Sequence, residues 1–214
     1  ALADCETALE IAESMRDINA QVKAHDALGY AHNHFRNKKV AVIHYTFIMK
    51  FSDDSEQRAQ ARYNIALQFH KNPFRQDTAM VYMQKAREVW EKSENTPKVC
   101  SSSLGIANLH RVAGRYEEAI VEYNRALSLG GKTSERVTCY EYLGFIASEQ
   151  NRLDEAVALF KEALKYDSAQ KNKRQVYIST KLGETYVKQG RNELGAALCD
   201  SMLTLVENND NFND

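Results

Sequence analysis

The sequence is poor in the residues that make tight turns: among its 214 residues only nine are glycine and two are proline. A β-sandwich or β-barrel needs a turn about every 8 to 12 residues, and such turns usually contain these two residue types. The scarcity therefore argues against an all-β fold. Apolar residues nevertheless make up 43% of the chain, so a chain of this length can bury a continuous core.

An excess of charge of one sign is also missing. Lysine and arginine total 28 and aspartate and glutamate total 29, which gives a formal net charge of −1. General nucleic-acid binding needs a surplus of cations to neutralise phosphates, so we do not expect it. No uninterrupted apolar run approaches the roughly 18 residues of a membrane-spanning helix, and we expect no membrane span.

The start of the sequence lacks the basic region of a signal peptide. Residue 1 is alanine, not methionine, and the residue pattern is helical from the start. We interpret the sequence as an excised or processed piece of a longer protein.

Closely spaced cysteines are absent. The four cysteines, Cys5, Cys100, Cys139 and Cys199, all lie more than 30 residues apart, which excludes C-x-x-C and zinc-finger spacing. We expect them to be reduced and to pack as small buried apolar residues. The default location of such a chain is the cytoplasm.

A pattern of apolar and small residues recurs with a period near 40 residues. Each copy contains an apolar residue followed by glycine or alanine, and the apolar positions are spaced 37, 41, 37 and 39 residues apart. Twelve or thirteen residues after each glycine or alanine comes a second small residue, with a larger apolar residue or cysteine four positions later. The five pairs are Leu28-Gly29, Ile65-Ala66, Ile106-Ala107, Leu143-Gly144 and Leu182-Gly183.

These residues resemble the pattern of the tetratricopeptide repeat (TPR) family over essentially the whole chain. The resemblance implies an all-α fold: a right-handed superhelix, or α-solenoid, of about five antiparallel helix pairs after an unpaired helix at residues 1–18. We expect this solenoid to be a single domain over residues 1–207, followed by a frayed acidic tail at 208–214. The usual period is 34 residues, so the longer spacing implies lengthened connections or helices. The expected repeats span approximately 20–53, 57–93, 98–131, 134–167 and 172–206.

Small residues are expected where the two helices of a pair cross, because a larger side chain would push the helix axes apart. Glycine inside a helix costs about 1 kcal/mol relative to alanine, so Gly144 needs a packing reason, and we expect it to face Ala156. Tyr123 and Phe160 would fill the groove to the next repeat. The positions with this structural role are Gly29, Ala41, Ala66, Ala79, Ala107, Ala119, Gly144, Ala156, Gly183 and Gly195.

The sequence also predicts where several helices begin and end. Gly114, Gly190 and Asn151 are expected in the left-handed conformation that ends a helix. Three residues are expected to cap helix N-termini: Asp53, Thr133 and Ser168.

In the TPR family the first helix of each pair lines a concave groove, and the resemblance places twelve side chains of this chain there. An apolar centre would consist of Tyr63, Leu67, Leu104 and Phe145. Cations beside it would suit an extended or helical peptide with an apolar anchor and an acidic group. The alternative is that these aromatic residues contact neighbouring repeats and are not free. The groove candidates are Tyr30, His34, Tyr63, Asn64, Leu67, His70, Lys71, Leu104, Asn108, Arg111, Glu141 and Phe145.

Chaperone-binding members of the family hold a C-terminal carboxylate with lysine and asparagine. Asn64 matches one such asparagine, but Asp26 and Tyr30 stand where the first repeat would supply its ligands. The clamp is therefore incomplete, and we do not expect this chain to bind chaperone tails.

Catalytic and metal-binding motifs are absent from the sequence. The segment Gly130-Gly131-Lys132-Thr133 lacks the upstream glycine and the preceding strand of a phosphate-binding loop. His25 and His32 share a helix face, which raises a metal hypothesis, but they occupy the aromatic packing positions of the first repeat. We therefore expect core histidines, no cofactor, no metal and no enzymatic activity.

The function that the sequence favours is a non-enzymatic scaffold for a protein or peptide, as a module of a larger signalling protein. A second hypothesis is the signal-sensing domain of a bacterial-type transcriptional regulator, which would use the same groove. A third is self-association, since a solenoid without capping helices could form homo-oligomers through its ends. RNA binding by the related pentatricopeptide architecture is disfavoured because acidic residues such as Asp26, Glu141 and Glu184 make the groove mixed in charge.

Overall fold

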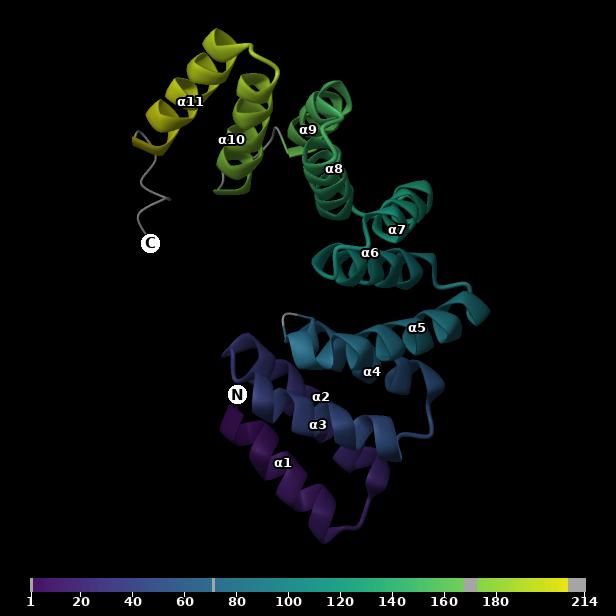
Figure 1. Ribbon diagram of the computed structural model, residues 1–214. Coiled ribbons are helices and arrows are strands. Elements are labelled where there is room, and N and C mark those ends of the chain that lie inside the picture. Colours follow the sequence, from purple (N-terminus) through teal and green to yellow (C-terminus); the bar gives the residue numbers. More distant parts are fainter. Residues whose placement is uncertain (1, 71, 168–172, 208–214) are drawn as a thin grey trace. The chain divides into compact units, whose positions relative to one another are not determined.

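The computed structural model describes residues 2–70, 72–167 and 173–207. Every regular element within these ranges is a helix (Figure 1). The expected tail at 208–214, the expected N-cap Ser168 and the groove candidate Lys71 lie outside the described residues. No described helix is both long and apolar enough to cross a membrane.

The chain divides into two compact units at Gly114. The first unit contains six α-helices and one short 3₁₀ helix, and each α-helix packs against the next along the chain. Its elements are α1 (Leu2–Ser14), α2 (Ile18–His34), α3 (Lys38–Phe51), α4 (Ser55–Phe69), η1 (Pro73–Arg75), α5 (Gln76–Lys92) and α6 (Thr96–Val112).

The second unit contains five α-helices that also pack in chain order, with an additional contact between α8 and α10. Its elements are α7 (Tyr116–Ser128), α8 (Thr133–Glu149), α9 (Leu153–Asp167), α10 (Lys173–Lys188) and α11 (Asn192–Glu207). Over the described ranges this gives eleven α-helices, which confirms the expected all-α fold.

The core of each unit lies between its packed helices. In the first unit it contains Tyr45, Met83 and Trp90, and in the second Phe160, all almost completely buried. The alanines expected at helix crossings have no exposed surface, which agrees with the role assigned to them: Ala41, Ala66, Ala79, Ala107, Ala119 and Ala156.

Two glycines of the first helices, Gly29 and Gly144, let aromatic rings approach the helix backbone. A Cβ atom added at Gly29 would lie 2.7 Å from Cε1 of Tyr45, and one added at Gly144 would lie 2.9 Å from the ring of Phe160. Each ring belongs to the second helix of the same pair, sixteen residues later. Burial, with Asp26 and Tyr30 nearby, raises the pKa of Tyr45 to about 12, so the ring over Gly29 stays uncharged.

This geometry corrects the expected partner of Gly144, because the nearest atoms are those of Phe160 and not of Ala156. Phe160 therefore packs onto its own helix pair, where it excludes any side chain at position 144. Small residues do face one another in the last pair. A Cβ at Gly195 would lie 3.0 Å from the carbonyl oxygen of Gly183.

Several first helices end at a residue with positive φ. The expected left-handed conformation is present at Gly114, Gly190 and Asn151. After α8, the backbone amide of Arg152 donates to the carbonyl oxygen of Ala147 at 2.8 Å. After α10, the backbone amide of Arg191 donates to the carbonyl oxygen of Tyr186 at 2.9 Å. These are the bonds of a helix-ending Schellman turn.

Three further residues with positive φ were not expected, because they are neither glycine nor asparagine: Arg16, Arg36 and Glu94. The same six-residue hydrogen bond closes each of these turns, for example from the amide of Asn37 to the carbonyl of His32 at 2.8 Å. A left-handed conformation of such a residue costs about 1–2 kcal/mol, which the surrounding turn must offset.

Two of the expected N-caps are shifted by one residue. Asp54, not Asp53, caps α4, where its carboxylate accepts hydrogen bonds from the amides of Glu56 and Gln57. Helix α8 begins at Thr133, so Lys132 is the capping residue, and its amide donates to the carboxylate of Glu135 at 2.9 Å.

We predict that Gly144→Leu destabilises the protein by about 1–3 kcal/mol, because the new side chain overlaps the buried ring of Phe160. Chemical unfolding of the variant and the wild type measures the difference in the free energy of unfolding. Gly183→Ala is the control, since its added methyl group would meet no atom closer than 3.4 Å. An unchanged stability of Gly144→Leu would mean that the helix pairing is wrong.

Candidate functional site

Exposed apolar side chains lie on the first helices of successive pairs in the first unit. Tyr30 of α2 is 72% exposed and Leu67 of α4 is 37% exposed. A hydrogen bond joins the two helices beside these residues: the side-chain Nε2 of Gln68 donates to the side-chain oxygen of Asn33 at 2.9 Å. Asn64 lies one turn before Gln68 and accepts from Gln60 at 3.0 Å. We call these five residues the first-helix face: Tyr30, Asn33, Asn64, Leu67 and Gln68.

The other groove candidates of the first unit have different surroundings. His34 is exposed at the end of α2. His70 is half-buried, and its Nδ1 lies 2.5 Å from the carbonyl oxygen of Leu67. The ring of Tyr63 packs edge-on against Trp90, with 5.4 Å between centroids, so this tyrosine partly serves the core. On α6 the candidates are half-buried: Leu104, Asn108 and Arg111.

Two candidates, Glu141 and Phe145, belong to the second unit. Phe145 is half-buried. Glu141 is only 7% exposed, and its carboxylate accepts from Nε of Arg174 at 2.9 Å. Arg174 also donates to the hydroxyl of Thr138 at 2.6 Å, so Glu141 joins α8 to α10. An apolar centre that combines Phe145 with residues of the first unit stays a prediction.

None of the four cysteines forms a disulfide bond. Cys100 and Cys139 are buried and Cys5 is half-buried, but Cys199 is exposed, which differs from the expectation of a buried residue. Its sulfur occupies the repeat position of the ring that covers Gly144, and it would lie 3.4 Å from a Cβ at Gly183.

Histidines form a cluster between α2 and α3. The Nδ1 atoms of His25 and His44 are 2.8 Å apart, and the rings of His32 and His44 stack with 5.4 Å between centroids. His25 also stacks on Phe47 at 3.9 Å. The cluster therefore packs as part of the helix interface, and the described residues contain no group of three or more ligands arranged to hold a metal ion.

The environment of this cluster disfavours protonation. Burial, together with the proximity of His25 and His32, lowers the pKa of His44 from its ordinary 6.5 to about 4. Burial also lowers the pKa of His25, while Glu13 acts in the opposite direction. In both histidines burial lowers the pKa because the charged imidazolium would be removed from water.

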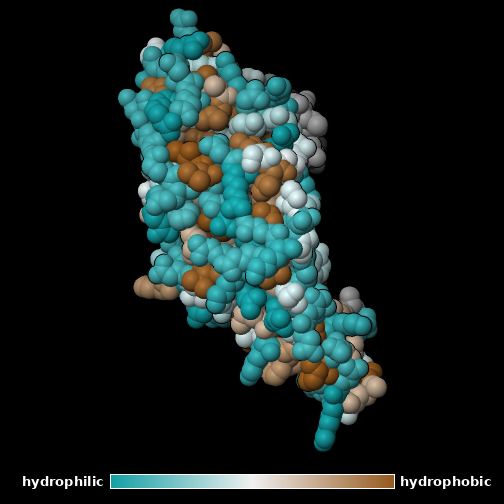
Figure 2. All heavy atoms as spheres, turned by 90° about the vertical axis from the view of Figure 1, so that its right-hand side faces the viewer, coloured by the Kyte–Doolittle hydropathy of each residue, from teal (hydrophilic) through white to brown (hydrophobic). Residues whose placement is uncertain are grey.

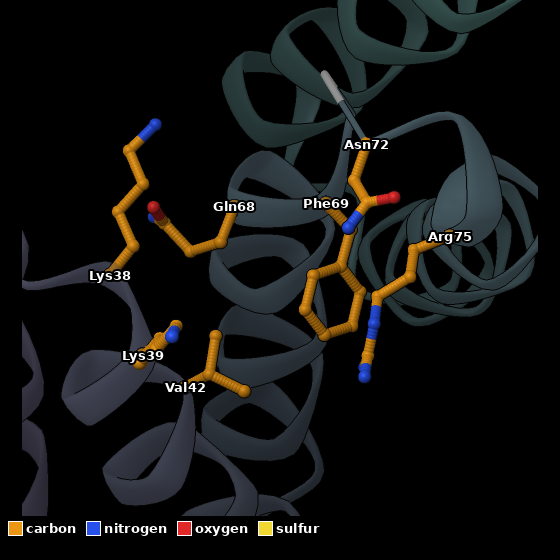
Figure 3. Close-up of a pocket in the computed structure, with 7 residues that line it drawn as sticks. All are labelled: Lys38, Lys39, Val42, Gln68, Phe69, Asn72 and Arg75. Carbon is orange, nitrogen blue, oxygen red and sulfur yellow. The ribbon is translucent and has the colours of Figure 1, made fainter.

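One pocket was not anticipated from the sequence. It has a volume of about 420 Å³ and lies where the start of α3 meets the end of α4 (Figure 3). Three cationic residues line it: Lys38, Lys39 and Arg75. The sequence feature that could have indicated this pocket is the Lys-Lys pair at the start of a helix, where acidic residues are more usual.

The surface outside these sites is mixed. On the side of the protein shown in Figure 2, hydrophobic residues form small groups separated by hydrophilic ones. Isolated exposed apolar side chains are normal on a protein surface and need no ligand to explain them. Tyr30 and Leu67 differ because they share one face of two helices that a hydrogen bond joins.

Sequence profiles of one family match the chain. A profile described as a tetratricopeptide repeat matches residues 98–169, and another with this description matches residues 143–210. A third, described as the SusR N-terminal TPR domain, matches residues 30–126. No curated protein matches the chain at a significant level.

Solved structures with similar folds include three with low sequence identity. BtubC (BKLC) from P. vanneervenii is 16% identical, with a TM-score of 0.77 over 95% of this chain and 89% of that chain. The apo quorum sensor NprR from B. thuringiensis is 17% identical, with a TM-score of 0.76 over 94% and 63%. The Rap conjugation gene regulator of plasmid pLS20, in complex with the Phr* peptide, is 16% identical, with a TM-score of 0.71 over 95% and 57%.

These identities show a shared fold alone. The chain spans less than two thirds of the length of NprR and of the Rap regulator.

We predict that the first unit loses stability as the pH falls from about 6.5 toward 4. His44 has a lowered pKa when folded, so over this interval the unfolded chain binds a proton that the folded chain does not, and acid favours unfolding. The contribution is complete above about pH 6.5 and declines below it. Thermal unfolding between pH 7 and pH 5, where histidine is the main titrating side chain, measures the effect.

The variant His44→Phe removes one of the two histidines with a lowered pKa and should reduce the dependence of the melting temperature on pH. His34→Phe, at an exposed position, should leave the dependence as in the wild type. A wild-type melting temperature that does not change between pH 7 and pH 5 would contradict the assignment.

Proposed function

This chain belongs to the tetratricopeptide repeat family, whose fold is generally a non-catalytic scaffold for protein interactions, and from this premise we propose that it binds a protein or peptide ligand on the first helices of its repeats. No enzyme family is indicated by the profiles and structures that it matches. The ligand is an extended or helical peptide with an apolar anchor, and the scaffold is a module of a larger regulatory or signalling protein. A cytoplasmic location is part of this proposal.

The observation that carries the proposal is the exposure of Tyr30 and Leu67 on two helices that the hydrogen bond between Gln68 and Asn33 joins. Leu28 and Ala66, which precede them by one or two residues, are buried, so the exposure of Tyr30 and Leu67 is not a consequence of loose packing. Removing such side chains from water stabilises a complex by about 25 cal/mol for each Å² buried. Tyrosine is also enriched among residues that dominate binding energy.

Polar groups beside these apolar side chains supply orientation. The amides of Asn33, Asn64 and Gln68 lie on the same face, and their hydrogen bonds to one another and to Gln60 fix their positions. Amide groups can donate to and accept from the backbone of an extended peptide. An apolar anchor with adjacent fixed amides therefore suits a peptide better than a small apolar molecule.

A signal-sensing domain of a bacterial-type regulator is the second candidate. It is supported by the similarity to the SusR N-terminal TPR domain over residues 30–126 and by the fold shared with the quorum sensor NprR and with a Rap regulator that holds the Phr* peptide. In this version of the proposal the ligand is a signal peptide, and its binding alters a neighbouring domain.

Self-association is a third candidate, supported by exposed apolar side chains at the end of α1. Ile11 of α1 is 54% exposed, and Met15, which directly follows this helix, is 69% exposed. A second copy of the chain could bury this surface and form a homo-oligomer.

We predict that a double variant, Tyr30→Ala with Leu67→Ala, binds peptide at least tenfold more weakly than the wild type, equivalent to about 1.4 kcal/mol. The peptides are those selected from a random library on the wild-type protein, and fluorescence anisotropy measures their affinities. The physical reason is the loss of the two exposed apolar anchors.

Val81→Ala is the matched control, because Val81 is 45% exposed in the same unit but lies on α5, a second helix. It should bind the selected peptides as the wild type does. Peptides that bind the double variant and the wild type equally would place the ligand elsewhere and contradict the proposal.

A further inference from the structure

The unanticipated pocket of the first unit brings three cations to one cavity. Lys38 and Lys39 come from the first turn of α3, and Arg75 comes from η1, after the end of α4 (Figure 3). The described residues that line the pocket include no aspartate or glutamate. No ion pair to a carboxylate is found for these three residues within the described part of the chain.

The absence of a counter-charge is electrostatically unfavourable. The N-terminus of a helix carries a partial positive charge, which favours acidic residues in the first turn. Lys38 and Lys39 occupy the first turn of α3, and its N-cap residue Asn37 makes no side-chain capping bond. A bound anion would offset the repulsion among these like charges.

Arg75 lies beside an aromatic ring. Its guanidinium carbon lies 4.7 Å from the centroid of the Phe69 ring. A guanidinium cation close to an aromatic ring is attracted to it and can still donate its fork of N–H groups to other partners. This fork matches two oxygens of a phosphate group.

The remaining walls of the pocket are an amide and apolar groups. The side-chain oxygen of Asn72 accepts from the amide of Phe74 at 3.0 Å, which turns its nitrogen toward Phe69 (Figure 3). That nitrogen is a further donor to an anion. Val42 and Phe69 form apolar surface, and about 420 Å³ is more room than one phosphate ion needs.

From this combination we propose that the pocket binds a phosphate monoester: a dianionic phosphate held by Lys38, Lys39 and Arg75, with an apolar body against Val42 and Phe69. The site is separate from the peptide-binding proposal, because it shares only Gln68 with the first-helix face. A carboxylate carries one charge and offers two oxygens, so it fits the three cations less well. The first unit would therefore sense a phosphorylated compound beside its peptide-binding face.

Isothermal titration calorimetry at pH 7.5 with three probes tests the site: phenyl phosphate, inorganic phosphate and benzoate. Phenyl phosphate should bind most tightly, and benzoate, which has the same ring but one charge, at least tenfold more weakly. Inorganic phosphate should also bind more weakly than phenyl phosphate, since it lacks the apolar body. Inorganic phosphate or benzoate binding as tightly as phenyl phosphate would overturn the proposal.

The double variant Lys39→Gln with Arg75→Gln should weaken phenyl phosphate binding at least tenfold. It should not lower the melting temperature without ligand, because both residues are exposed and their charges repel one another. Lys85→Gln, which removes an exposed lysine of the same unit outside the pocket, should bind as the wild type does. Equal loss in Lys85→Gln, or no loss in the double variant, would overturn the proposal. Tyr30→Ala with Leu67→Ala should keep phenyl phosphate binding, which separates this site from the first-helix face.

Discussion

The structure depends on the close approach of an aromatic ring to a bare stretch of helix backbone. Where Tyr45 lies over Gly29, and Phe160 over Gly144, no side chain at the glycine could be accommodated without displacing a buried ring. The glycine is therefore not a weakness in the helix. Its cost of about 1 kcal/mol in helix propensity is offset by burial of a large aromatic side chain, which contributes roughly 1.5–3 kcal/mol.

The same contact determines which side of each first helix remains available. Successive residues of a helix are rotated by about 100°, so when Gly29 faces the second helix, Tyr30 is turned away from it. Ala66 and Leu67 repeat this relation in the next pair, with Ala66 buried and Leu67 exposed. The packing constraint and the proposed binding face are thus two consequences of one helical register.

Much of the architecture could be predicted from the sequence, because the repeated small residues carry the packing rule directly. The helix pairs and the left-handed turns at Gly114, Gly190 and Asn151 follow from local residue preferences. The turns at Arg16, Arg36 and Glu94 could not be predicted, since their conformation is imposed by the packing of neighbouring helices and not by the residue type. Similarly, the partner of Gly144 depends on the rotamer of Phe160, which sequence spacing does not specify.

The candidate site was predictable only in part. The resemblance to the TPR family was sufficient to expect Tyr30 and Leu67 on a first-helix surface. Glu141 was expected there on the same ground, but it pairs with Arg174 from the next repeat. The cationic pocket was missed because Lys39 and Arg75 are far apart in sequence and line one cavity only through the packing of α3 and α4. One unit of six α-helices thus offers two chemically different surfaces, one apolar with fixed amides and one cationic.

The central claim is that the rings of Tyr45 and Phe160, on second helices, lie directly on Gly29 and Gly144 of the first helices. Nuclear Overhauser effects measured by NMR test this claim most directly. We predict strong effects between the Hα protons of Gly29 and the ring protons of Tyr45, and between those of Gly144 and Phe160, with upfield ring-current shifts of both glycines. Ordinary helical shifts for both glycines, without effects to these rings, would contradict the account.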